Sequence, residues 1–414
     1  MNSEKTPGKT RRIVSAALAV LFLILICAVP LHAFFTNGKA IVKSVRYKKA
    51  KKYLADTENY DVFDMLSARV SSLQAELEDS TPYDDELGYM NASLQLALGK
   101  QLITAGDTNL VTLSGGQLVR LTTQKSFSAK AEEIVRFMEK LDMPCFFSYI
   151  TPQFCAGGRQ MPEGFAALDT SDELADEVLS IVSEAGFPAY DSRTFFEGTP
   201  YTEDELWMRT DMHWTTLAAI EAAKLYAARI TELTGTSLDT SRLDIANFDT
   251  ETYEDLFLGE YGQQIGVMNS GLDDITVYTP KYETSFRREW LDKKHVSGSA
   301  EGTFAEAAIR WDMLEKEPEG YSVTAYADYG LVEYTDHLTN LGDCADLTVL
   351  IFKDSYSAPV GTFLSLLVKD VYMVDMRTAD ADTHAIDFVE ACDPDIVIVS
   401  YSMPMLELKS FTLE

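Results

Sequence analysis

The residues best suited to chemistry form two short groups that lie far apart in the chain. Asp211 and His213 stand in "TDMHWTT", with one residue between them, and Ser355 stands in "FKDSY". A serine hydroxyl becomes a good nucleophile when a histidine takes its proton. The histidine in turn needs a carboxylate to fix its tautomer and to stabilise its charged form. These three residue types predict nucleophilic acyl transfer if the fold brings them together.

Each group also has an ordinary structural interpretation. Ser355, or the aspartate before it, would cap the helix that follows the turn. In the other group, Thr210 or Asp211 would be a helix cap and His213 a core residue beside Trp214. An Asp-x-His metal pair is a further alternative, but no other histidine lies nearby in the sequence to complete it, and we expect no metal or other cofactor.

Buried strands alternate with helices around both groups. The expected helices are 131–143, 172–186, 215–233, 360–368 and 383–394, and the expected strands are 144–152, 187–193, 346–352, 370–377 and 395–402. Such alternation predicts a parallel sheet covered by helices. Sites in these sheets form beyond the carboxyl ends of the strands, where Ser355 stands.

Composition and charge exclude one class of function. The chain has 414 residues, 46% of them hydrophobic, and a net charge of −30. Residues 1–52 carry eleven basic side chains and one acidic one, which leaves 24 basic and 64 acidic side chains, a net charge of −40, for residues 53–414. An acidic body repels phosphate backbones, so we expect no nucleic-acid partner. The basic residues near the N-terminus predict contact with anionic membrane lipid.

An uncharged apolar segment, Ile13–Leu31, follows the first four basic residues. Its length is close to the roughly 20 residues that cross a bilayer. A cleaved signal peptide is the alternative, but "LHA" before Phe34 is a poor cleavage site. We therefore expect an uncleaved single-pass anchor in the cell membrane. The basic residues after the span favour a cytoplasmic body, whereas the early span and the acidic body favour export.

These features divide the chain into three regions. Residues 1–35 are expected to hold a cytoplasmic N-terminus and the anchor, residues 36–80 a basic helical stalk, and residues 81–414 the α/β domain. Within that domain, residues 240–345 are rich in Tyr, Asp, Gly and Thr and predict an insertion of loops and short strands. This insertion could instead be a protein-interaction surface. Cys145 and Cys155 could form a disulfide or be small buried residues.

The order of the motifs adds a family resemblance. The segments "TDMHWTT", "FKDSY", "VYMVDMR" and "DPDIVIV" together resemble the DHHW family, part of the SGNH-hydrolase-like group that includes the alginate O-acetylation proteins. The segment "LGEYGQQIG", 258–266, is similar to the glycine-containing segment that follows the DHHW motif. The resemblance spans residues 109–401 and implies a three-layer, flavodoxin-like α/β fold with a central parallel sheet. It also implies a permuted order in which Asp-x-His precedes the serine.

By resemblance, Ser355 is the nucleophile, His213 the general base and Asp211 its orienting acid. Two departures from the wider SGNH pattern leave the oxyanion donors open. Lys353 replaces the usual glycine before Asp-Ser, and no Gly-x-Asn-Asp block follows strand 395–399.

Four further residues are candidates for supporting the site or for stabilising an oxyanion: Asp354, Tyr356, Arg377 and Tyr401. The backbone amides of Ser355 and Tyr356 are further candidates for contacting the oxyanion. Arg377 would brace the site or bind a carboxylate, and the alternative is a structural ion pair with Asp375.

The resemblance implies a membrane-anchored, extracytoplasmic serine O-acetyltransferase or esterase that acts on a cell-envelope or exported polysaccharide. A multi-spanning membrane acyltransferase would be the acyl donor. Because a fold does not establish activity, the alternative is a catalytically inactive carbohydrate-binding or assembly protein on the same fold.

Overall fold

The structure is a computed structural model that describes residues 69, 84–105, 108–113, 115–151, 161–162, 164–292, 295–329, 335–378, 383–408 and 412–413. The chain divides into two compact units, Met1–Met90 and Asn91–Glu414, and the account below concerns the second. The expected anchor, and the expected stalk apart from Arg69, lie outside the described residues. In the described part, no helix is both long enough and apolar enough to span a bilayer.

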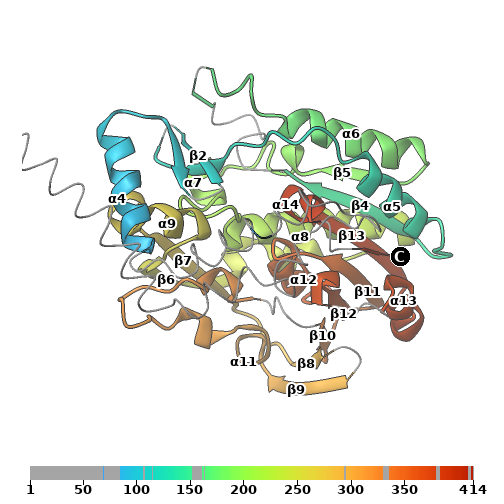
Figure 1. Cartoon of the computed structure of the whole chain (residues 1–414). Coiled ribbons are helices and arrows are strands. Elements are labelled where there is room, and N and C mark those ends of the chain that lie inside the picture. The colour runs from blue at the N-terminus through green and yellow to red at the C-terminus, as the bar shows by residue number, and fades with distance from the viewer. Residues whose placement is uncertain are drawn as a thin grey trace, which may run out of the picture. The chain divides into compact units, whose positions relative to one another are not determined.

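An eight-stranded mixed sheet forms the centre of the second unit (Figure 1). In spatial order its strands are β5 (Ala189–Asp191), β4 (Cys145–Ile150), β13 (Ile396–Ser402), β11 (Ala345–Lys353), β12 (Val368–Val374), β10 (Thr335–Asn340), β8 (Phe286–Asp292) and β9 (His295–Gly302). The first five strands in this order, β5, β4, β13, β11 and β12, run parallel to one another. The last three, β10, β8 and β9, each pair antiparallel with the strand before them. The α/β fold is confirmed, but the sheet is mixed and not purely parallel as predicted.

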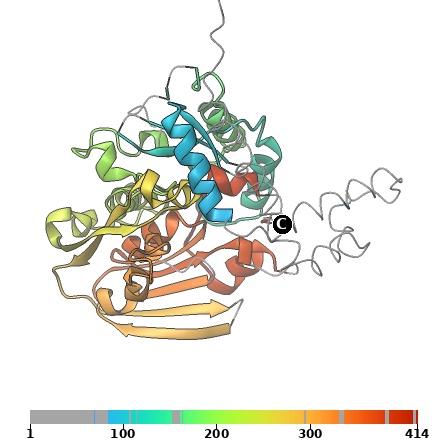
Figure 2. The ribbon, with the colours of Figure 1, turned by 60° about the vertical axis from the view of Figure 1, so that its left-hand side comes forward.

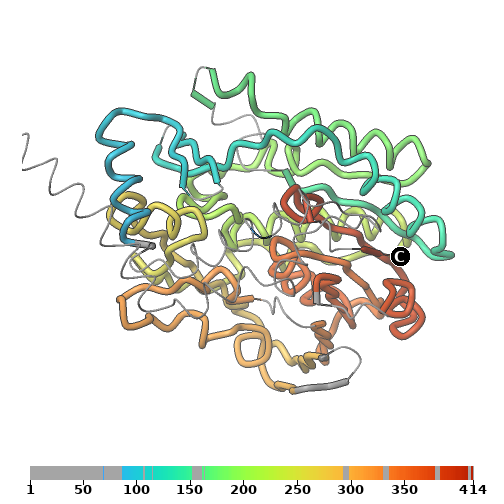
Figure 3. Tube along the Cα trace, viewed as in Figure 1, coloured from blue at the N-terminus to red at the C-terminus, as the bar shows by residue number. Residues whose placement is uncertain are grey.

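Helices cover both faces of this sheet because its central strands are apolar on both faces. β4 and β13 are buried at every position. α5 (Ser128–Met138), α6 (Ser171–Glu184) and α13 (Ala385–Cys392) pack on one face, and α8 (Thr216–Thr234) and α12 (Ser357–Leu364) pack on the other. α8 and α12 lie side by side in Figures 1 and 3. Cys145 on β4 is a free, buried thiol, in line with the expectation of a small core residue, and Cys155 lies outside the described residues.

Residues 240–345 contribute more to the sheet than we expected. They supply three strands of the eight-stranded sheet, β8, β9 and β10. They also form a separate antiparallel pair, β6 (Phe248–Phe257) and β7 (Asp273–Pro280). Figure 2 shows β8 and β9 as a hairpin at the edge of the sheet. The charged residues of "FRREWLD" hid this strand from sequence reasoning, because Arg288 is buried by pairing with Asp336, with Nε 2.9 Å from Oδ1.

Shorter elements complete the unit. β1 (Leu102–Ala105), β2 (Thr108–Thr112) and β3 (Leu118–Arg120) form an antiparallel sheet, in which β2 and β3 pair on either side of Gly115 and Gly116. Among the described residues, the remaining α-helices are α4 (Asp84–Ala97), which begins before Asn91, α7 (Glu203–Leu206), α9 (Glu260–Ile265), α10 (Val267–Ser270), α11 (Phe304–Ala308) and α14 (Met403–Glu407). Single 3₁₀ turns lie at Ser192–Thr194, Thr240–Leu243, Ile245–Asn247, Trp311–Leu314, Ala325–Ala327 and Met376–Thr378.

Candidate active site

Ser355 lies on the turn between β11 and α12, at the carboxyl end of a parallel strand. The carboxylate of Asp354 holds this turn, because its Oδ1 accepts the amide of Tyr356 at 3.1 Å and its Oδ2 accepts the amide of Ser402 at 2.6 Å. The first residue of α12 follows Tyr356, and no side chain caps this helix. The Ser355 hydroxyl is therefore not used as a helix cap.

Asp211 and His213 lie on a closed loop that precedes α8. An isolated antiparallel bridge pairs Trp207 with Trp214 across the base of this loop. The cap of α8 is Thr215, whose hydroxyl accepts the amide of Ala218 at 3.4 Å. The capping interpretation of Asp211 therefore does not apply to α8, and its carboxylate is available for other partners.

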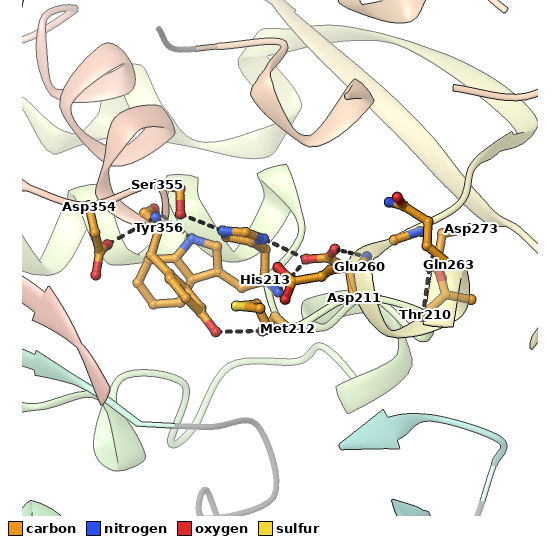
Figure 4. Close-up of polar contacts among 12 residues, drawn as sticks. Thr210, Asp211, Met212, His213, Glu260, Gln263, Asp273, Asp354, Ser355 and Tyr356 are labelled. Carbon is orange, nitrogen blue, oxygen red and sulfur yellow. Dashed lines mark hydrogen bonds and ion pairs between the residues drawn. The ribbon is translucent and has the colours of Figure 1, made fainter. Parts of the chain in front are cut away.

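The two groups meet in the structure (Figure 4). Oδ1 of Asp211 lies 2.5 Å from Nδ1 of His213, and Nε2 of His213 lies 2.6 Å from Oγ of Ser355. Both nitrogens of the imidazole are engaged, which leaves neither of them for a metal ion. With the Nδ1 proton donated to the carboxylate, Nε2 is the acceptor for the serine proton. This is the geometry that a serine nucleophile requires.

The environment of Asp211 keeps its carboxylate charged. Burial alone would raise its pKa, but the nearby His213 and hydrogen bonds from that ring and from the amides of Glu260 and His213 lower the pKa below its usual value. The Glu260 amide donates to Oδ2 at 2.7 Å, and the His213 amide donates to Oδ1 at 2.9 Å. A buried carboxylate held in this way can stabilise an imidazolium.

Two aromatic side chains pack against the imidazole. The ring of Tyr326 stacks on His213 with centroids 4.8 Å apart, and the ring of Tyr356 lies at 4.6 Å. Tyr356 also joins the two turns, since its hydroxyl donates to the Met212 carbonyl at 2.7 Å and its carbonyl accepts the Trp214 indole N–H at 2.9 Å. Trp214 is a packing residue, buried to 2% exposure.

The four supporting candidates take different places. Asp354 braces the serine turn, as described above, and the Tyr356 amide is occupied by that carboxylate. Arg377 forms the expected alternative contact, an ion pair with Asp375 in which Nη2 lies 2.6 Å from Oδ2. Arg377 also lines the cavity in front of Ser355. Tyr401 is buried within the core beneath the α5 and α6 layer and does not line that cavity.

A cavity of about 310 Å³ opens onto Ser355 and His213. Its walls contain residues that sequence reasoning missed: Arg120, Glu260, Tyr261, Gln264, Tyr326 and Glu407. Arg120 and Glu407 form an ion pair, with Nη2 2.6 Å from Oε1. Glu260 to Gln264 lie in the glycine-containing segment that carried the resemblance. Tyr326 lies on the 3₁₀ turn Ala325–Ala327, within residues 240–345, where we expected loops and short strands.

Comparison with known protein families supports the resemblance. Residues 159–310 match the family model described as an SGNH hydrolase-like domain, acetyltransferase AlgX. This match includes Asp211 and His213 and ends before Ser355. No curated protein matches the chain.

Two solved structures share the fold. A DHHW family protein from Eubacterium siraeum DSM 15702 is 17% identical with a TM-score of 0.57, over 74% of this chain and 94% of that one. PatB1 from Bacillus cereus, solved with a sulfonyl adduct, is 16% identical with a TM-score of 0.54, over 74% and 98% of the two chains. The predicted resemblance to SGNH-hydrolase-like DHHW proteins is confirmed, and at these identities the structural likeness shows the fold.

Proposed function

We propose that this protein is a serine O-acetyltransferase or esterase that acts on polysaccharide hydroxyl groups. The observation that carries the proposal is the continuous relay from Asp211 through His213 to Ser355 in the wall of the cavity. The match to a family described as an acetyltransferase supports acyl transfer as the reaction class.

The first half-reaction would form an acyl-enzyme. Ser355 Oγ attacks the acyl carbonyl carbon while His213 Nε2 takes its proton, and Asp211 stabilises the imidazolium that results. The tetrahedral intermediate then collapses, the bond to the leaving alcohol breaks, and His213 returns the proton to that alcohol. The acyl group is left as an ester on Ser355.

The Ser355 amide is a candidate donor for the oxyanion of that intermediate. Among the described residues none accepts a hydrogen bond from this amide, and the residue lines the cavity. The second half-reaction reverses the roles, because His213 takes a proton from the acceptor hydroxyl as that oxygen attacks the acyl-serine. A sugar hydroxyl as acceptor gives a transferase, and water gives an esterase.

The proposal includes a location and partners. The apolar segment Ile13–Leu31 would anchor the chain in the cell membrane, with its basic flank against anionic lipid and the α/β domain on the outer side. The acceptor would then be a cell-envelope or exported polysaccharide. A multi-spanning membrane acyltransferase would supply the acyl group.

Covalent labelling tests the proposal directly. A fluorophosphonate should label the wild-type protein at a single serine, and Ser355→Ala should abolish the label. Ser357→Ala is the matched control, because that hydroxyl lies two residues away and bonds to Ser400 at 2.6 Å instead of to a histidine. Absence of labelling and of acetyl-ester turnover in the folded wild-type protein would reject the enzyme and favour the carbohydrate-binding alternative.

A further inference from the structure

Asp273, at the start of β7, binds the two residues that precede the catalytic acid. Its Oδ1 accepts the amide of Arg209 at 2.8 Å. Its Oδ2 accepts both the amide of Thr210, at 2.8 Å, and the hydroxyl of Thr210, at 2.5 Å. One carboxylate, 62 residues downstream of Asp211, thus takes three donors from the backbone and side chain next to that acid.

Thr210 also binds a third segment, the start of α9. Because its hydroxyl donates to Asp273, the same oxygen can accept, and it accepts the amide of Gly259 at 2.9 Å. The carbonyl of Thr210 accepts the amide of Gly262 at 2.8 Å. These bonds place the first turn of α9 against the Asp211 loop, where the Glu260 amide reaches Oδ2 of Asp211. Figure 4 shows Asp273, Thr210, Glu260 and Asp211 in this arrangement.

The approach of α9 to the loop requires glycine at two positions. A Cβ on Gly259 would lie 2.6 Å from the Thr210 carbonyl oxygen and 2.7 Å from the Asp211 Cα. A Cβ on Gly262 would lie 2.9 Å from the Thr210 Cβ. All three distances are shorter than ordinary van der Waals contacts of a Cβ atom. The spacing of glycines in "LGEYGQQIG" therefore serves the contact with the acid.

The orientation of the Asp211 carboxylate depends on this arrangement. Its two oxygens have separate tasks, since Oδ1 accepts from His213 and Oδ2 accepts from Glu260. The Glu260 amide on Oδ2 and the His213 amide on Oδ1 thus determine together which oxygen faces the imidazole. Without the bonds from Thr210 to α9, the Glu260 amide is held less firmly against Oδ2, and the carboxylate is oriented by the His213 amide alone.

We propose that Asp273 and Thr210 are positioning residues that hold the Asp211 carboxylate in its productive orientation through the first turn of α9. The inference rests on the proposed function, because it assigns a purpose to the same relay. Neither residue is assigned to touch the substrate. Their removal should slow the chemical step and leave substrate binding unchanged.

The test measures the rate of fluorophosphonate labelling in the full-length protein, together with its end point. Asp273→Asn replaces one carboxylate oxygen by an NH₂ group, which cannot accept the hydrogen bonds that Arg209 and Thr210 donate. Thr210→Val removes the hydroxyl and keeps the shape of the side chain. We expect each to lower the labelling rate about 10-fold, with kcat for a chromogenic acetyl ester falling equally and KM unchanged. The end point counts folded sites and should stay at the wild-type level. Thr210→Ser keeps the hydroxyl and should restore the rate.

Two controls separate positioning from general damage. Asp274→Asn alters the adjacent carboxylate, which accepts the Asp255 amide at 2.8 Å, and it should keep the wild-type rate. In an Asp211→Asn background, Asp273→Asn should lower the rate less than about twofold further, because residues that act through one group are not additive.

Three outcomes would overturn the inference. A wild-type rate in Asp273→Asn and Thr210→Val, with labelled wild-type protein, would reject this inference alone. Full additivity with Asp211→Asn would show that Asp273 acts by another route and would also reject it. If the wild-type protein is not labelled at all, the proposed function fails and this inference with it.

Discussion

Two Asp–His–hydroxyl clusters in this protein contain similar residue types in different arrangements. The first is Asp211, His213 and Ser355. The second is Asp370, His337 and Thr339, on the antiparallel strands β12 and β10, where His337 Nε2 lies 2.7 Å from Asp370 Oδ1 and 3.2 Å from Thr339 Oγ1. Composition alone would not tell them apart.

The difference lies in how the histidine uses its two nitrogens. His213 meets the carboxylate with Nδ1 and the serine with Nε2, so Nε2 can take the serine proton while the Nδ1 proton stays bonded to the carboxylate. In the second cluster, Nε2 faces both the carboxylate and the threonine. The Thr339 hydroxyl donates to Asp370 at 2.9 Å, and Nε2 must carry a proton to donate to the same carboxylate. That nitrogen cannot then accept the threonine proton.

The surroundings of the two clusters also differ. Ser355 follows a parallel strand and opens onto a cavity, whereas Thr339 lies within a strand. His337 is covered by Tyr372, whose ring stacks at 3.9 Å, and its Nδ1 lies 3.4 Å from the carboxylate of Glu289 on β8. The second cluster links three antiparallel strands by side-chain contacts. Position in the topology, and not residue type, separates a relay from a structural contact.

The largest expected effect is the difference between removing His213 and removing His337. His213→Ala should lower acetyl-ester turnover by about 10³-fold or more, because the serine loses its base. His337→Ala should leave turnover within about twofold of wild type. Steady-state turnover of both variants, normalised to folded protein by circular dichroism, measures this. Equal losses in the two variants would remove the distinction between the clusters.

Replacing the aspartates of the two clusters, Asp211 and Asp370, should give a smaller difference in kcat. Asp211→Asn keeps the shape of the side chain but no longer stabilises the imidazolium, and we expect a loss of about 10²- to 10⁴-fold in kcat. Asp370→Asn should leave kcat unchanged. Measured kcat values at pH 7 for the two variants test this. If Asp211→Asn retained full activity, the relay would have to be replaced by a mechanism that does not use this acid.

The sequence predicts the parts of the site whose positions depend on the order of strands and helices. The turn after a buried apolar strand places Ser355 at the carboxyl edge of the sheet, and a loop before a helix can place Asp211 and His213 at the same edge. These positions depend on local patterns of hydrophobicity and on the alternation of strands with helices. The structure brings all three residues together within hydrogen-bond distance.

The remaining parts depend on contacts that no local pattern encodes. Tyr326 reaches His213 from a 3₁₀ turn, and Asp273 reaches Thr210 from the start of β7, and neither contact follows from the local sequence pattern. β8 was also missed, because an arginine such as Arg288 is expected at the surface unless its buried partner, Asp336, is known. Pairings between distant charged or polar residues have to be seen in three dimensions.

The smallest expected effect concerns the stability that the second cluster provides. Burial would raise the pKa of Asp370, but hydrogen bonds from His337 and Thr339 and the neighbouring charge lower it below its usual value. A carboxylate with a lowered folded-state pKa stabilises the fold above its unfolded-state pKa, and this stabilisation is lost as the pH falls through the folded-state value. Asp370→Asn should therefore lower the free energy of unfolding by about 1 kcal/mol at pH 7.

Urea unfolding of the wild-type protein and Asp370→Asn between pH 7 and about pH 2 measures the difference. The two free energies should converge at the acidic end, where both side chains are neutral. Glu319→Gln is the control for the loss of one exposed carboxylate. A difference that stays constant with pH would mean that Asp370 stabilises the sheet by shape alone. A loss of turnover in Asp370→Asn would instead show that the antiparallel part of the sheet is coupled to the site.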